Sequence, residues 1–311
     1  MHSFLLVLVH LVFNLMTFDN DSQSINMENI ATENIKQLAE PVIELIDVST
    51  SFGDQIVHSE ICLEVHRSEI FALIGGSGSG KSTLLREMIM LHQPNAGQIK
   101  LLGINLLDIS KEDALALRQR TGVMFQLGGL FDSLTLLENI GLPLREHTSL
   151  PDSLINDIAS SKLAMVGLEP EAGKQYPSEI SGGMTKRASL ARAIALDPEI
   201  LFLDEPTAGL DPASAAGVDE LVLKLRDLFG LTIVMITHDL DLLWQVADRV
   251  AVLADGKVQS IGSMSVLSKS ENPAIRKFFD GPRGRAAQIS EKQPIQISTN
   301  HLNEKISSIP K

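Results

Sequence analysis

The chain is poor in cysteine and in basic residues, and each of these deficits argues against a kind of structural feature or partner. The only cysteine, Cys62, cannot form an internal disulfide, and its apolar, strand-like context predicts a small buried residue in a protein of a reducing compartment. Lysine and arginine number 26 against 39 aspartates and glutamates, and the formal net charge of −13 disfavours a broad nucleic-acid-binding face. We therefore expect no structural disulfide and no nucleic-acid partner.

Long hydrophobic runs are also missing. The apolar run at residues 4–16 is shorter than the roughly 20 residues that a membrane-spanning helix needs. No lysine or arginine precedes Lys36, so the basic region of a signal peptide is absent as well. Met27 opens a polar lead-in to the first predicted strand, and we expect it to be the working start, with residues 1–26 as an upstream translation. The competing hypothesis is an N-terminal segment that contacts a membrane.

What the sequence does contain predicts an α/β fold. Apolar residues make up 44% of the 311 residues, enough for one or two sizeable cores, and buried-strand patterns alternate with helical patterns. Segments 42–48 and 56–65 alternate apolar and polar residues, which predicts two antiparallel strands joined by a loop. Phe52 lies in that loop, where its ring could stack on a planar base. Asp255-Gly256, between two apolar runs, predicts a second hairpin.

The most specific motif follows the buried-strand pattern at residues 70–74. It reads Gly75-Gly76-Ser77-Gly78-Ser79-Gly80-Lys81-Ser82 and leads into a helix predicted from Thr83 to about Leu91. This matches the phosphate-binding pattern G-x-x-x-x-G-K-[ST], in the strand–loop–helix context that the pattern requires. Glycines let backbone N–H groups surround phosphates, Lys81 reaches the β- and γ-phosphates, and the Ser82 hydroxyl coordinates Mg²⁺. We therefore predict nucleotide binding.

A second arrangement suited to phosphate chemistry lies at residues 180–212. Ser181-Gly182-Gly183 precedes a helical pattern from Met184 to Leu196, so Ser181 is a predicted N-cap and the first N–H groups of the helix can face an anion. Residues 200–203 form a buried-strand pattern, and Asp204 and Glu205 follow it directly. Because consecutive strand side chains point to opposite sides, one carboxylate can hold a metal while the other addresses water.

Two more polar side chains stand where predicted strands end. Residues 121–126 form a short strand pattern that ends in Gln126, whose amide could ligate Mg²⁺ or orient water. Residues 231–237 form another buried strand, and His238 follows it. Ligands of open α/β folds bind at the carboxyl ends of the strands, which makes His238 a candidate phosphate contact.

With these motifs in this order, residues 42–280 resemble the ATP-binding subunits of ABC transporters. Residues 75–82 are similar to the family's Walker A motif, 200–204 to its Walker B motif and 208–211 to its D-loop. Residues 181–184 are similar to its signature motif, from which Ile180 and Met184 depart. The resemblance implies a P-loop ATPase with a mostly parallel core sheet, an antiparallel β subdomain and a helical subdomain at about 127–190.

The resemblance also implies a role for each site residue. Two copies of such a subunit close head to tail, so that each ATP lies between the Walker A motif of one copy and the signature helix of the other. The implied catalytic residues are Glu205, which polarises the attacking water, and His238 and Lys81, which stabilise γ-phosphate charge. The implied Mg²⁺ ligands are Ser82, Gln126 and Asp204. The implied ATP-binding residues are Phe52, Gly75, Gly76, Ser77, Gly78, Ser79, Gly80, Lys81, Ser82, Thr83 and Gln126. The implied contacts to the opposite ATP are Ser181, Gly182, Gly183 and Asp211.

A narrower resemblance concerns the transported substrate. Residues 125–148, Met184 and residues 278–286 are similar to the ATPases of Mla-type, MCE-associated phospholipid transporters. Such an ATPase works with a permease, a membrane-anchored MCE protein and often a STAS-domain protein, on the cytoplasmic face of the bacterial inner membrane. The complex moves phospholipids between inner and outer membranes. Leu130 and Phe131 are candidates for the surface that receives the permease, with packing in the helical subdomain as the alternative.

Other functions stay open at this point. The nearest alternative is the ATPase of an importer for small polar solutes such as amino acids. A soluble ABC ATPase of translation or DNA repair, and a small-molecule P-loop kinase, fit less well because the chain shows one ATP unit, no long coiled coil and a signature-like motif. Residues 281–311, with five lysines and arginines against two glutamates, are expected to form a mobile tail or partner arm. Residues 1–41 are expected to be an N-terminal extension.

Overall fold

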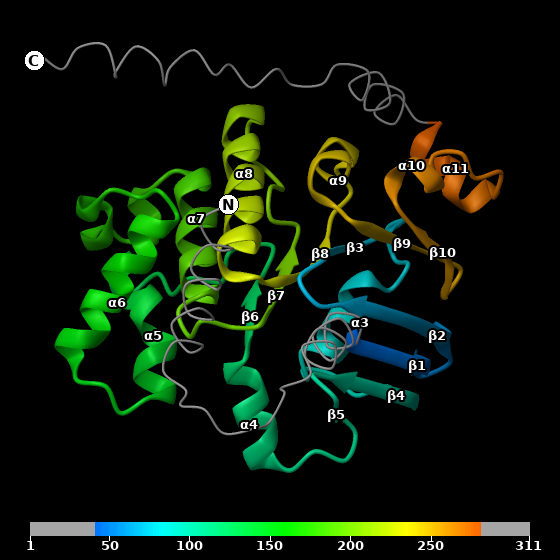
Figure 1. The fold of residues 1–311 in the computed structure, drawn as a ribbon, viewed down its shortest axis with the longest axis horizontal. Helices are drawn as coiled ribbons and strands as arrows, with labels where there is room; N and C mark the ends of the chain where they lie inside the picture. The colour runs from blue at the N-terminus through cyan, green and yellow to red at the C-terminus, as the bar shows by residue number, and fades with distance from the viewer. Residues whose placement is uncertain (1–40, 281–311) are drawn as a thin grey trace, which may run out of the picture.

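The computed structural model describes residues 41–280. Residues 1–40 of the predicted N-terminal extension and the predicted tail at 281–311 lie outside the described residues. Figure 1 shows a group of helices, α5 to α7, on one side of the central sheet and a small antiparallel sheet on the other. None of the helices in the described part of the chain is long and apolar enough to cross a membrane.

The small sheet is antiparallel and has the strand order β2-β1-β4-β5. β1 (Pro41–Phe52) pairs with β2 (Gln55–His66), as the alternation in the sequence predicts, although Phe52 is the last residue of β1 rather than part of the loop. β4 (Ala96–Leu101) and β5 (Ile104–Asn105) complete it. Its apolar face forms one core with Phe71, Leu73 and the buried side of the following helix.

Cys62 is exposed, which corrects the prediction that it is buried. Its neighbours in β2, Ile61 and Leu63, point into the core, and successive side chains of a strand point to opposite faces. Cys62 therefore faces solvent, where its thiol donates to Asp47 Oδ1 at 3.2 Å. The apolar character of the segment predicts burial, but the register of the strand decides which side chains are buried.

The central sheet has the order β10-β9-β3-β8-β7-β6, and every neighbouring pair from β9 to β6 is parallel. This agrees with the predicted mostly parallel core sheet. β9 and β10 form the predicted hairpin through Asp255-Gly256, whose φ angles of 53° and 70° lie in the left-handed region that such a turn requires. The strands are β3 (Ile70–Gly75), β6 (Thr121–Met124), β7 (Ile200–Asp204), β8 (Thr232–Ile236), β9 (Arg249–Ala254) and β10 (Lys257–Gly262).

Helices cover the central sheet and form a separate group beside it. Leu136, Ile140 and Leu163 from this group join the same core as Leu201 and Ile233 of the sheet. The α-helices are α3 (Lys81–Met88), α4 (Lys111–Gln119), α5 (Leu136–His147), α6 (Asp152–Met165), α7 (Gly182–Ala193), α8 (Pro212–Phe229), α9 (Leu240–Val246), α10 (Met264–Leu267) and α11 (Pro273–Phe279). Two short 3-10 helices are η1 (Pro170–Lys174) and η2 (Pro177–Glu179).

Local signals explain where these helices begin and end. Ser181 caps α7 by accepting from Met184 N–H, as predicted, so the helix starts at the signature glycines. α3 ends at Met88, before the predicted Leu91, because Met90 adopts a φ of 58° and the Leu91 N–H turns back to the Arg86 carbonyl at 2.8 Å. Asp211 caps α8 and Gly230 ends it in the left-handed conformation.

Candidate active site

The strand order brings the sequence motifs to one edge of the central sheet. Gly75 ends β3, Asp204 ends β7 and Gln126 follows β6, and these strands run parallel. β8, which leads to His238, lies between β3 and β7. Because the carboxyl ends of parallel strands share an edge, the phosphate loop, the carboxylates and the histidine all lie at that edge.

The phosphate loop connects β3 to α3 and has little room for side chains. A Cβ on Gly75 would lie 2.4 Å from Ser79 Oγ and 2.5 Å from the Leu253 carbonyl oxygen. Gly80 has a φ of 92°, which favours glycine, and it is the N-cap of α3. Gly76, Ser77 and Gly78 are exposed at the top of the loop. The loop thus presents backbone and the N-terminus of a helix to solvent, as an anion site does.

Lys81 lies across this loop. Its Nζ donates to the carbonyl oxygens of Gly75 at 2.8 Å and Gly76 at 3.0 Å. Burial lowers the pKa of Lys81, and the negative charges of Glu205 and Asp204 oppose that effect. The ammonium is therefore hydrogen-bonded to the loop and lies within the electrostatic influence of the two carboxylates.

Asp204 and Glu205 differ in their surroundings, as the sequence predicts for consecutive carboxylates. Burial, and then the charge of Glu205, raise the pKa of Asp204, with Arg86, Lys186 and Lys81 opposing. Glu205 leaves the strand with a φ of 50°, and its N–H donates to the Ile236 carbonyl at 2.9 Å. His238 Nδ1 lies 2.9 Å from Glu205 Oε1. The histidine and the glutamate, which follow two different strands, β8 and β7, therefore form one pair.

Lys186, on α7, is a site residue that the sequence reasoning missed. It is 6% exposed, and its Nζ donates to the backbone carbonyls of Gln126 at 2.6 Å and Glu205 at 2.9 Å. Burial lowers its pKa, opposed by the charges of Glu205 and Asp204. Its one sequence signal is that the residues one helical turn away on either side, Gly182, Gly183, Ser189 and Leu190, are small or apolar. Through Lys186 the helix that begins with Gly182 and Gly183 contacts both the Gln126 loop and Glu205 at the end of β7.

Replacing Lys186 by methionine is expected to lower the free energy of unfolding by about 2 kcal/mol, since the part-buried hydrogen bonds to two carbonyls are lost while the apolar stem is kept. Thermal unfolding of the full chain measures this as a lower Tm. Lys224→Met is the matched control, because the Lys224 side chain is 62% exposed and pairs only with Glu220 on the surface. Equal Tm values for the two variants would show that the hydrogen bonds of Lys186 do not stabilise the fold.

The predicted trans contacts lie at the starts of two adjacent helices. Ser181 and Gly182 are exposed at the start of α7, and a Cβ on Gly183 would lie 3.3 Å from Ser214 Oγ on α8. Asp211 is exposed, and its carboxylate accepts from the N–H groups of Ala213 and Ser214 at 3.1 Å. Hydrogen bonding to Ser214 keeps the pKa of Asp211 low. These groups form a surface at the starts of α7 and α8, where Ser181 and Asp211 already accept from backbone N–H groups of their own helices.

Phe52 and Gln126 complete the set of predicted residues. The Phe52 ring is 51% exposed and lies 5.0 Å from the His92 ring, at an interplanar angle of 32°. One face of the ring is thus supported while much of it remains accessible. Gln126 is exposed two residues after β6, and its backbone carbonyl is held by Lys186. Thr83, in the first turn of α3, is half-buried behind the phosphate loop.

These features define a P-loop nucleotide hydrolase. A family model described as "ABC transporter" matches residues 58–208. The probable ribonucleotide transport ATP-binding protein mkl of Mycobacterium tuberculosis is 38% identical over 279 residues, which cover 86% of this chain and 77% of that protein. The intermembrane phospholipid transport system ATP-binding protein MlaF of Escherichia coli K12 is 38% identical over 247 residues, which cover 79% of this chain and 91% of that protein.

A solved structure agrees with the sequence relatives. The ATP-binding cassette MJ0796, determined as a dimer in a post-hydrolysis state with ADP and Pi, superimposes with a TM-score of 0.66 at 30% identity. The match covers 71% of this chain and 98% of that one. The chain belongs to the ABC transporter family, and it is an ATP-binding, ATP-hydrolysing subunit of that family. The predicted fold class and enzyme class are thereby confirmed.

Proposed function

We propose that the chain is the ATPase of a transporter that moves phospholipids between membranes. The observation that carries this is the 38% identity to the intermembrane phospholipid transport protein of E. coli over 91% of its length. The mycobacterial relative named for ribonucleotide transport is equally identical but matched over 77% of its length, which makes ribonucleotides the second candidate substrate. No relative reported above supports an amino acid importer.

For the chemistry we propose the roles that the geometry supports. Glu205, held by His238 and by its own backbone contacts, positions and polarises the attacking water. Lys81 leaves the Gly75 and Gly76 carbonyls to contact the β- and γ-phosphates, and His238 adds a donor to the γ-phosphate. The phosphate-loop residues 75–83 hold the triphosphate, and Phe52 stacks on the base.

Mg²⁺ fits the donor set at this edge. Among the described residues, no group of three or more His, Cys, Asp or Glu side chains could hold a metal alone. Mg²⁺ at nucleotide sites uses few protein ligands together with phosphate oxygens and water. Ser82, Gln126 and Asp204 each supply one oxygen-bearing side chain. A cation there would also favour the ionised form of Asp204, whose pKa is raised by burial. When bound, the ion would neutralise phosphate charge.

The functional unit in this proposal is a head-to-tail dimer of two copies. Ser181, Gly182, Gly183 and Asp211 lie at exposed helix starts, and Ser181 already uses its hydroxyl as a cap. Helix N-termini attract phosphate, so a second copy that presents its ATP to this surface would complete the site. The cassette MJ0796, determined as a dimer with ADP and Pi, supports the dimeric part of this proposal.

A permease would dock beside Gln126. Leu127 is 90% exposed and Phe131 54% exposed, and Phe125 adds a third accessible apolar side chain. Buried Asn139 anchors the end of this loop, since it accepts from the Phe131 N–H at 2.8 Å and donates to the Phe131 carbonyl at 3.1 Å. Leu130 instead packs against the core, which agrees with the alternative prediction that it packs in the helical subdomain. Exposed apolar groups on a fixed loop are typical of a partner surface.

The proposed complex places this subunit at the cytoplasmic face of the inner membrane, with a permease, an MCE-domain protein and a STAS-domain protein. Tagged purification from detergent-solubilised membranes tests it, with the associated proteins and lipids identified by mass spectrometry. We expect a permease, an MCE protein and phospholipid. Recovery with a permease and bound nucleotides would contradict the phospholipid proposal and favour the second candidate.

A pair of variants tests the docking surface in the same experiment. Leu127→Asp is expected to lower permease recovery at least about tenfold, because a charge replaces an apolar contact at a desolvated interface. Leu228→Asp is the matched control, since Leu228 is 69% exposed on α8, far along the chain from this loop. Nucleotide binding should persist in both variants. Equal permease recovery by the two would place the docking surface elsewhere.

A further inference from the structure

Beneath the phosphate loop lies a buried polar cluster that the proposed mechanism does not use. It consists of Thr50 on β1, His58 on β2 and Glu87 on α3, each 1% exposed. His58 Nε2 lies 3.1 Å from the Gly80 carbonyl oxygen, and Thr50 Oγ1 donates to Glu87 Oε1 at 2.5 Å. The cluster thus runs from the antiparallel sheet to the last glycine of the phosphate loop.

The two remaining polar atoms of the cluster face each other. His58 Nδ1 and Glu87 Oε2 are 3.7 Å apart, and both are buried without a hydrogen-bond partner. The Gly80 carbonyl only accepts, so the Nε2 atom of His58 carries the proton and Nδ1 presents a lone pair. With Oε1 occupied by the Thr50 hydroxyl, a proton on Glu87 belongs on Oε2, directed at that lone pair.

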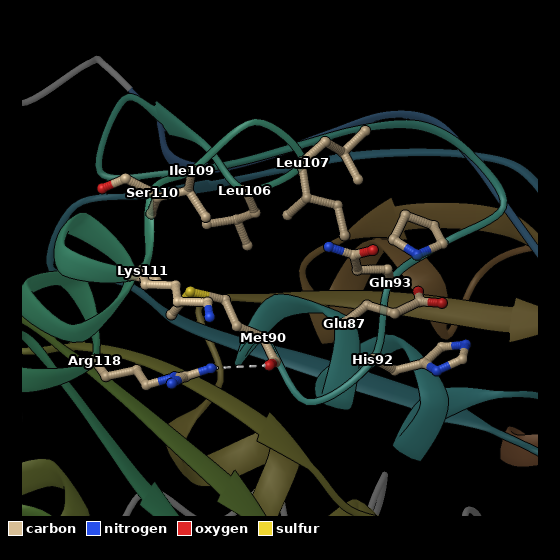
Figure 2. Close-up of a pocket in the computed structure, with 13 residues that line it drawn as sticks. Glu87, Met90, His92, Gln93, Leu106, Leu107, Ile109, Ser110, Lys111 and Arg118 are labelled. Atoms are coloured by element: carbon tan, nitrogen blue, oxygen red, sulfur yellow. Dashed lines mark hydrogen bonds between the residues drawn. The ribbon is translucent and has the colours of Figure 1, made fainter.

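Burial favours this neutral arrangement. It raises the pKa of Glu87 to about 7, against a smaller opposite effect of the Thr50 hydrogen bond, and it lowers the pKa of His58. The titratable groups that share a pocket of about 180 Å³ with Glu87 are His92, Lys111 and Arg118. Figure 2 shows Lys111 and Arg118 on the opposite side of that pocket from Glu87.

Other elements around the cluster bring few charges to it. β3 has no charged residue, and Lys100 on β4 is paired with Glu44 at 3.2 Å. The β9–β10 hairpin contacts β2 directly beside His58, because the Ser59 N–H donates to the Gly256 carbonyl at 2.8 Å. Lys257 of this hairpin faces Glu60 at 3.6 Å. The hairpin therefore supports the part of β2 that carries His58.

The contact with Gly80 matters because of the peptide unit to which its carbonyl belongs. That planar unit also contains the Lys81 N–H, which in a trans peptide points away from the carbonyl. It is the first N–H of α3 and has no partner within the helix, so it is a donor for phosphate. Donation to a carbonyl polarises its peptide and strengthens the N–H of the same unit.

We propose that His58, oriented by Glu87, is a positioning residue for ATP binding that fixes and polarises the Gly80–Lys81 peptide. The close approach requires glycine at position 80, where a Cβ would lie 2.2 Å from His58 Nε2. The proposal rests on the ATP-binding role of the loop and not on the transported substrate. It can therefore be tested on the full chain without a permease.

The first test compares His58→Leu with His66→Leu, a control on the same strand. The hydrogen bond from His58 acts equally on bound ATP and on the transition state. Its loss in His58→Leu should therefore raise KM for ATP about fivefold and leave kcat within about twofold of the wild-type value. ATP affinity measured by equilibrium titration falls by the same factor. His66→Leu keeps wild-type values. An unchanged KM in His58→Leu, or a loss confined to kcat, overturns the proposal.

The second test uses Glu87→Gln, whose amide can donate to His58 Nδ1 and accept from Thr50 at every pH. In the wild type, ionisation of Glu87 above about pH 7 puts a carboxylate next to the Nδ1 lone pair and favours the tautomer protonated at Nδ1, which removes the donor to Gly80. KM for ATP therefore rises above pH 7 in the wild type and stays flat in Glu87→Gln. Identical pH profiles overturn the role of Glu87.

A spectroscopic measurement makes the result independent of turnover. Nitrogen NMR of the 15N-histidine-labelled full chain reports the tautomer of His58. The signal of His58 is assigned as the one that is lost in His58→Leu. If the leucine variant does not fold, His58→Gln serves for the assignment. We expect the neutral form protonated at Nε2 at pH 6.5. A neutral form protonated at Nδ1, or an imidazolium, at that pH contradicts the proposed geometry.

Discussion

Glu205→Gln is expected to lower ATP turnover by about 100-fold to 10,000-fold while ATP still binds. The amide keeps the size of the side chain and can still accept from His238, which lies 2.9 Å from Glu205 Oε1. The phosphate loop and Lys81 are untouched. What disappears is the negative charge that we propose polarises water, so the loss should fall on the chemical step. With ATP bound but not consumed, the proposed dimer should remain closed.

Three measurements on the full chain check this result. Steady-state hydrolysis gives the turnover, equilibrium titration gives the ATP affinity, and size-exclusion chromatography with ATP gives the proportion of dimer. Glu220→Gln is the control, because Glu220 lies exposed on α8 and forms a surface ion pair with Lys224. If Glu205→Gln hydrolyses ATP within a few fold of the wild type, another group activates the water.

The second large effect is expected from mixing two inactive variants. Lys81→Ala removes the proposed charge-assisted donor to phosphate and should weaken ATP binding about 10-fold to 100-fold. Ser181→Arg places a bulky side chain at the exposed start of α7, where the opposite ATP is proposed to bind. In a homodimer of either variant, both ATP sites carry the defect of that variant. A mixed dimer has both defects in one site and leaves the other site intact.

Mixing equal amounts should therefore restore activity, up to about a quarter of the wild-type sites if subunits exchange at random. Hydrolysis measured before and after mixing, under conditions that allow exchange, tests this. Ser160→Arg, at an exposed position of α6, controls for the arginine itself, and circular dichroism checks that loss of the Ser181 cap leaves α7 folded. No recovery on mixing contradicts the head-to-tail dimer.

The sequence predicts the elements of the site better than their contacts. Residues 200–204 read as a buried strand because every side chain before Asp204 is apolar, and the phosphate loop reads from its own glycines. Both are local properties. The pairing of Glu205 with His238 depends on β8 lying beside β7, and strand order does not follow from the pattern of either strand.

The residues that sequence reasoning missed share one property. Lys186, His58 and Glu87 are buried polar residues whose hydrogen-bond partners lie 19 to 60 residues away in the chain. In a sequence, a lone lysine or glutamate on a helix is indistinguishable from a solvated one. Only the fold shows that its partners are carbonyl or hydroxyl groups from other elements.

The exposed thiol of Cys62 gives the wild-type chain a ready-made attachment point for a reporter. Because the sequence has one cysteine, a maleimide spin label reacts at a single defined position on β2, on the face opposite the core. A pair of subunits then carries two labels related by the symmetry of the pair. Their separation, followed by dipolar spectroscopy as ATP is added and consumed, would trace the working cycle without altering any residue of the natural sequence.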